Sequence, residues 1–73
     1  MMRRYILIDP FTNRPYLTGN ATEALRQATQ MNKESENHPA FILYRTDLQG
    51  RGLYVATLAR KFGTDEFYWE AKK

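Results

Sequence analysis

The sequence of 73 residues contains no cysteine and only one histidine, His38. Without cysteine the chain can form neither a disulfide framework nor a thiolate metal site, which are common supports of small domains. Its apolar runs are far shorter than the about 20 residues of a membrane-spanning helix, and none has the form of a secretory signal. We therefore expect a cytoplasmic protein that has no contact with a membrane.

Residues suited to catalysis are also scarce. Catalysis by side chains generally needs a nucleophile beside a base, two positioned carboxylates or a bound metal. His38 stands beside Pro39 in a polar stretch, which is typical of a solvated loop histidine, and the carboxylates are dispersed along the chain. The segment Gly50-Arg51-Gly52 is too short for a phosphate-binding loop. We expect no catalytic residue, no metal site and no cofactor, and hence a protein that is not an enzyme.

The composition favours a folded domain with a small excess of positive charge. Hydrophobic residues make up 42% of the chain and aromatic residues 14%, which is more than disordered segments usually contain. No linker or repeat interrupts the sequence, so residues 1–73 are expected to form a single domain. Eleven Lys and Arg against eight Asp and Glu give a net charge of +3, which is modest for a protein that coats nucleic acid.

Runs of β-branched and aromatic residues predict five strands, at residues 5–8, 16–18, 40–46, 53–58 and 67–69. The first strand is apolar on both faces, so we expect it to be central in its sheet. The first two strands would form a hairpin, and the last three would form a meander joined by polar turns.

Between the second and third strands the sequence predicts one helix. Asn20 suits a helix N-cap, and Glu23 follows it at the spacing of a capping box. The helix would pack through a narrow stripe rich in alanine, with Leu25 and Met31 as its main anchors. Residues 33–39 contain no apolar side chain before a closing proline, so they predict an exposed loop.

Residues 53–62 also fit a helix that would end at Gly63. We favour a strand there, because Tyr54, Val55 and Thr57 are better strand formers than helix formers. The predicted fold class is therefore α+β. It consists of an antiparallel sheet of four or five strands (hairpin, helix, three-strand meander) with one helix packed on one face.

The tyrosines are the most informative feature for binding. All five fall in predicted strands, and Tyr44, Tyr54 and Tyr68 belong to three successive ones. In a meander these three could lie in one cross-strand row on the face that the helix leaves open. Tyrosine also occurs on half-exposed strands without any binding role, but tyrosine and arginine are enriched at binding hot spots. The candidate partner-binding residues are Tyr44, Arg45, Arg51, Tyr54, Arg60, Lys61 and Tyr68.

Residues 58–65 resemble the first helix and turn of a helix-turn-helix, a DNA-binding motif, and the resemblance extends over residues 55–73. An alanine stands four residues before the turn glycine, as in that motif. Thr64 departs from the aliphatic residue that usually follows the glycine, and the following segment carries three carboxylates, which would repel phosphate. DNA or RNA binding, by this segment or by a face of tyrosine and arginine, is therefore the alternative function.

The layout as a whole is a short, cysteine-free chain of hairpin, helix and strand meander without catalytic residues. This layout resembles small phage-encoded proteins that bind and inhibit bacterial machinery, among them anti-CRISPR proteins. The resemblance covers the whole chain but rests on no motif, so it assigns no residue. It implies a non-enzymatic protein, in the cytoplasm of a bacterial host cell, that binds and inhibits or modulates a protein or nucleoprotein machine. We expect a monomer or a homodimer, and the modest charge favours a protein partner over nucleic acid.

Overall fold

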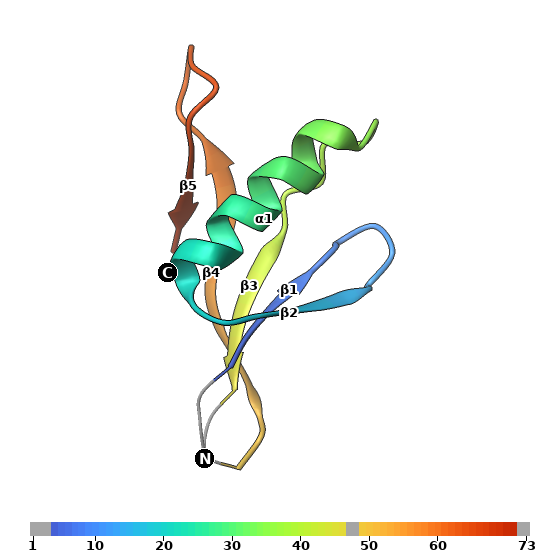
Figure 1. The fold of residues 1–73 in the computed structure, drawn as a ribbon, viewed down its shortest axis with the longest axis vertical. Coiled ribbons are helices and arrows are strands. Elements are labelled where there is room, and N and C mark those ends of the chain that lie inside the picture. The colour runs from blue at the N-terminus through green and yellow to red at the C-terminus, as the bar shows by residue number, and fades with distance from the viewer. Residues whose placement is uncertain (1–3, 47–48, 72–73) are drawn as a thin grey trace.

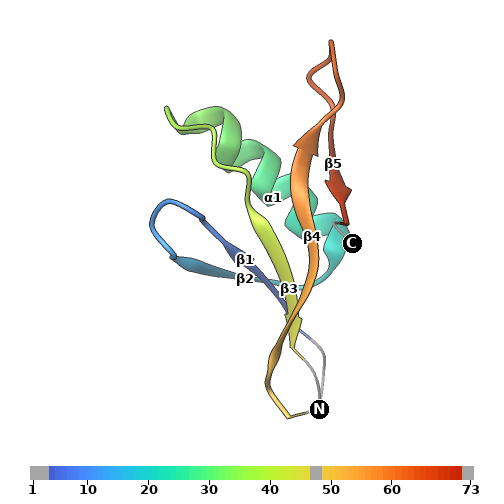
Figure 2. The ribbon, with the colours of Figure 1, turned by 180° about the vertical axis from the view of Figure 1, so that it is seen from behind.

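The computed structural model describes residues 4–46 and 49–71, which fold into five strands and one helix. In chain order these elements are β1 (Tyr5–Ile8), β2 (Pro15–Thr18), α1 (Ala21–Glu34), β3 (Ile42–Thr46), β4 (Gly52–Arg60) and β5 (Phe67–Glu70). The strands form one antiparallel sheet in the order β2-β1-β3-β4-β5, and α1 lies across one face of it (Figure 1). From behind, the sheet stands in front of the helix (Figure 2). The predicted α+β fold is confirmed, and β1 lies between two neighbouring strands as expected.

The helix begins where the sequence predicts. The Asn20 backbone is extended, and its side-chain Oδ1 accepts a hydrogen bond of 2.8 Å from the backbone N–H of Glu23. A second contact holds the first turn against the sheet, because the indole Nε1–H of Trp69 donates to the carbonyl of Ala21 at 3.1 Å. The start of α1 is therefore fixed both by its own cap and by the last strand.

Asn20→Ala should lower the free energy of unfolding by about 1 kcal/mol, because it leaves the Glu23 N–H without its acceptor. Urea denaturation of the two proteins measures this difference. Asn20→Asp is the matched control and should keep most of the stability, since aspartate caps helices about as well as asparagine. An unchanged midpoint for Asn20→Ala would mean that the cap contributes nothing.

The core lies between α1 and the central strands. Its fully buried members on the sheet side are Leu7, Leu43 and Phe41, and those on the helix are Ala24 and Ala28. The small alanines allow close contact between the helix and the sheet, as the alanine-rich stripe predicts. Leu25 and Met31, which were expected as main anchors, do pack against the core, but they are half-buried and less enclosed than the alanines.

The connection from α1 to β3 differs from the exposed loop predicted for residues 33–39. The helix continues to Glu34, and Pro39 is fully buried. The side-chain Nδ2 of Asn32 donates to the Pro39 carbonyl at 3.0 Å, and the ring Nδ1 of His38 bonds the Asn32 carbonyl at 3.0 Å. Since a carbonyl oxygen only accepts, Nδ1 carries the proton. These two bonds fold the connection back onto the helix, so His38 is not a purely solvated loop residue.

The segment predicted as either strand or helix is strand β4. It contains a β-bulge, because Leu43 pairs with Ala56 whereas Tyr44 pairs with Tyr54, which leaves Val55 as the extra residue. A turn and then β5 follow β4, so the helix-turn-helix interpretation of residues 55–73 is wrong. Residues 72–73 of that segment, and residues 47–48 of the predicted turn before β4, lie outside the described residues.

In the part of the chain that the structure describes, no helix has the length and apolarity needed to cross a membrane.

Candidate functional site

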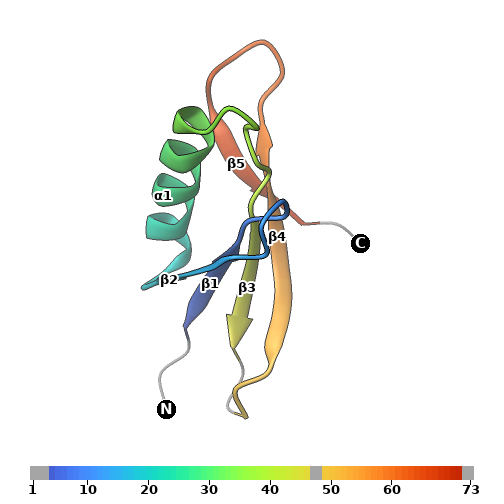
Figure 3. The same cartoon turned by 90° about the vertical axis from the view of Figure 1, so that its right-hand side faces the viewer.

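One face of the sheet carries no helix, as Figure 3 shows from the side. We call it the uncovered face. Side chains alternate between the two faces of a strand, and Leu7 and Leu43 face the helix, so strand pairing places their neighbours on the opposite side. The strand residues on the uncovered face are Ile6, Ile8, Pro15, Leu17, Ile42, Tyr44, Thr46, Gly52, Tyr54, Thr57, Ala59, Tyr68 and Glu70.

Four of these residues form a continuous row across four adjacent strands, which we call the apolar row. It runs from Leu17 through Ile6 and Tyr44 to Tyr54, each paired directly with the next. The rings of Tyr44 and Tyr54 lie 6.2 Å apart at an interplanar angle of 83°, an edge-to-face arrangement. The Tyr54 hydroxyl also hydrogen-bonds the hydroxyl of Thr57 at 2.8 Å. The two tyrosines are thus held in place rather than left to move independently.

The apolar row is accessible to a partner. Leu17 is 64% exposed and Tyr54 42% exposed, although both carry large hydrophobic side chains. Beside the row lies a hollow of about 420 Å³, lined in part by Ile6, Ile8 and Tyr44. An exposed row with an adjacent hollow is the shape that an apolar side chain from another molecule could fill.

Tyr68 does not join this row. It pairs with Ala59, two cross-strand rows beyond Tyr54, although it lies on the same face. Its hydroxyl donates to the Glu70 carboxylate at 3.4 Å. The expectation of a single row is therefore right for Tyr44 with Tyr54 and wrong for Tyr68.

The predicted basic residues do not gather around the tyrosines. Arg45 pairs with Tyr5 and Arg60 pairs with Phe67, and both aromatic partners pack against the core, so the two arginines lie on the helix side. Arg51 and Lys61 are exposed in the turns before and after the body of β4. Arg51 has an interaction partner in the structure. The seven candidate residues are thus divided between two faces and two turns.

The uncovered face is also nearly free of charge. Among its strand residues only Glu70 is charged, whereas the chain as a whole carries +3. The sequence-based candidates missed the aliphatic members of this face, which are Ile6, Ile8, Leu17 and Ile42. A signal for them was present, because a strand that is apolar on both faces must expose one face when only one helix is available as cover.

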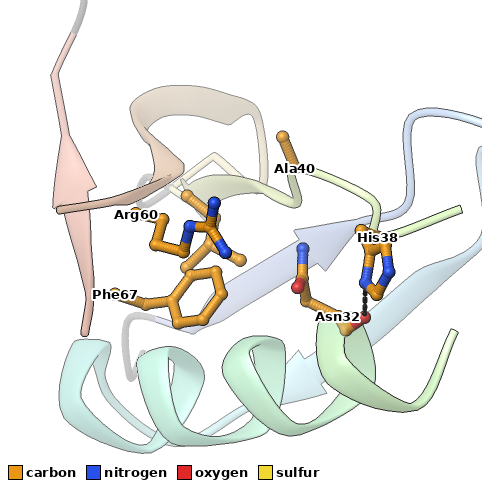
Figure 4. Close-up of a pocket in the computed structure, with 6 residues that line it drawn as sticks. Asn32, His38, Ala40, Arg60 and Phe67 are labelled. Atoms are coloured by element: carbon orange, nitrogen blue, oxygen red, sulfur yellow. Dashed lines mark hydrogen bonds between the residues drawn. The ribbon is translucent and has the colours of Figure 1, made fainter. Parts of the chain in front are cut away.

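The helix side of the sheet has a separate pocket of about 330 Å³ between α1 and the β4–β5 hairpin. It is lined by Asn32, His38, Ala40, Leu58, Arg60 and Phe67 (Figure 4). Arg60 and Phe67 form one wall, and Asn32 with His38 forms the opposite one. Among the described residues there is no group of three or more His, Asp or Glu side chains that could hold a metal ion.

Comparison of the chain with protein-family models, with curated proteins and with solved structures finds no match. The functional argument therefore rests on the geometry of these surfaces.

Proposed function

We propose that this chain is a non-enzymatic binding protein whose uncovered face packs against a partner protein. The observation that carries the proposal is the apolar row, in which Leu17, Ile6, Tyr44 and Tyr54 cross four strands without a charged residue. Exposed apolar patches of this kind commonly mark interaction sites. Tyrosine beside aliphatic residues, with charge excluded from the centre, is typical of the core of a protein interface.

A protein partner fits this face better than nucleic acid does. Nucleic acids can stack bases on tyrosine, but their binding also needs cations placed to contact the phosphates. The strand residues of the uncovered face include no Lys or Arg, and Arg45 and Arg60 lie on the opposite side of the sheet. The partner surface should therefore be largely apolar and uncharged where it meets the row.

The resemblance to phage-encoded inhibitors suggests the class of partner to test first. We propose a bacterial protein, or the protein part of a nucleoprotein machine, which the chain binds without turnover and thereby inhibits or modulates. Binding to a preformed sheet face requires little rearrangement of the chain. Since no turnover is proposed, we expect a stable complex of fixed stoichiometry.

Two substitutions in the apolar row test the proposal. A candidate partner is captured from bacterial lysate with and without nuclease treatment and then purified, and its affinity is measured by calorimetry. Leu17→Glu and Tyr54→Glu should each raise the Kd at least about tenfold, because each places a charge in a desolvated contact. Phe11→Glu is the matched control, since Phe11 is also 64% exposed but lies in the β1–β2 connection. The control should bind as the unmodified chain does.

Two results would overturn the proposal. One is an unchanged Kd for both row variants, since the uncovered face would then not be the contact surface. The other is a steep salt dependence, because affinity for nucleic acid through about six or more phosphates falls by orders of magnitude between about 50 and 200 mM salt. That result, together with loss of the captured complex on nuclease treatment, would establish the nucleic-acid alternative instead.

A further inference from the structure

The pocket on the helix side has a cationic group at its mouth and no acidic residue in its lining. The guanidinium of Arg60 points into the space between Phe67 and Asn32 (Figure 4). Within residues 4–46 and 49–71, this guanidinium makes no hydrogen bond and no ion pair. An arginine offers a planar fork of donors that matches a carboxylate. The pocket therefore presents an unused site for a carboxylate.

A second unused group lies on the opposite wall. Asn32 is only 8% exposed, and its Nδ2 donates to the Pro39 carbonyl. This bond fixes the orientation of the amide, so Oδ1 is the atom left toward the pocket, and within the described residues no donor reaches it. The described residues include no buried side-chain oxygen or nitrogen without a hydrogen-bond partner, so Oδ1 is open to solvent. An amide oxygen held in this way can accept an N–H or O–H of a ligand.

Apart from the His38 ring, the remaining lining is apolar. Leu58 is buried, Phe67 is half-buried, and Ala40 completes this apolar part of the lining. The ammonium of Lys33 lies 5.9 Å from the centre of the Phe67 ring, which adds positive charge near the pocket. The volume of about 330 Å³ falls at the lower end of small-molecule sites.

We propose that this pocket binds a small organic carboxylate that also carries an N–H or O–H donor. The carboxylate pairs with Arg60, the donor bonds Oδ1 of Asn32, and the apolar body of the ligand lies against Phe67 and Leu58. The site is on the helix side of the sheet, so it is independent of the binding function proposed for the uncovered face.

The test uses three probes of nearly the same size. 4-Hydroxybenzoate has both groups, benzoate lacks the donor, and 4-hydroxybenzamide lacks the charge. Titration of the ¹⁵N-labelled chain, followed by NMR, should show saturable shifts at Leu58, Arg60 and Phe67 with 4-hydroxybenzoate. The Kd should be severalfold higher for benzoate and at least tenfold higher for 4-hydroxybenzamide.

Arg60→Gln should raise the Kd for 4-hydroxybenzoate at least tenfold, and Arg60→Lys should restore part of the affinity. Arg45→Gln removes another helix-side arginine and should leave the Kd unchanged, as should Leu17→Glu on the uncovered face. The proposal is overturned by equal affinity for 4-hydroxybenzamide, by an unchanged Kd in Arg60→Gln, or by shifts that do not concentrate around the pocket. Amide spectra of each variant confirm that the fold is retained.

Discussion

Phe41→Ala is expected to lower the free energy of unfolding by about 3–5 kcal/mol, the usual range for removing a buried aromatic ring. Phe41 is only 2% exposed, and its ring meets that of Tyr16 edge-to-face at 6.2 Å. It lies just before β3, and its carbonyl accepts the N–H of Leu58 at 2.8 Å. A chain of this length has a total stability of roughly 4–11 kcal/mol, so the variant should lose about a quarter or more of its stability.

Chemical denaturation with circular dichroism measures this loss. Phe11→Ala is the matched control, because it removes the same ring from a site that is 64% exposed. The control should change the stability by less than about 0.5 kcal/mol, as is usual for surface sites. Similar midpoints for Phe41→Ala and Phe11→Ala would show that Phe41 is not part of the core.

The fold could be predicted because its strongest signals are local. The cap at Asn20 is specified by residues within one turn, and β1 is recognisable from four consecutive apolar residues. The choice of strand over helix for residues 53–62 was correct because β-branched and aromatic residues pack well on a pleated sheet. These features depend little on what the rest of the chain does.

The features that sequence analysis missed depend on contacts between distant segments. The bulge at Val55 shifts the pairing of β3 with β4, and nothing in the local sequence distinguishes Val55 from its neighbours. Register of this kind decides which tyrosines stand beside each other. Tyr68 consequently lies away from the other two, while Arg45 and Arg60 fall on the helix side.

The apolar residues of β1 contribute both to the core and to the uncovered face. With a single helix, the sheet can bury only one of its faces, yet β1 supplies apolar side chains to both. Ile6 and Ile8 therefore stay at the surface beside Tyr44 and Leu17, where a solvated sheet would normally carry polar residues. This mismatch between apolar surface and available cover is the reason to assign function to that face.

The largest error in the sequence-based description concerns the polar segment after the helix, and it leads to the second large effect. Asn32→Ala should lower the free energy of unfolding by about 1–3 kcal/mol, because it leaves the buried Pro39 carbonyl without its donor. Chemical denaturation measures the loss. Asn37→Ala is the matched control, since Asn37 is an exposed asparagine of the same connection, and it should be nearly neutral.

A second substitution separates the hydrogen bond from simple loss of volume. Asn32→Leu fills about the same space as asparagine but cannot donate to the Pro39 carbonyl. If the lost donor is the cause, Asn32→Leu should remain destabilised by about 1 kcal/mol or more despite the added apolar contact. If Asn32→Leu instead matches the unmodified chain, the bond to Pro39 contributes little and packing alone closes the connection. Faster amide exchange at Ala40 and Phe41 in both variants would accompany the first result, because the connection would open more often when the bond is absent.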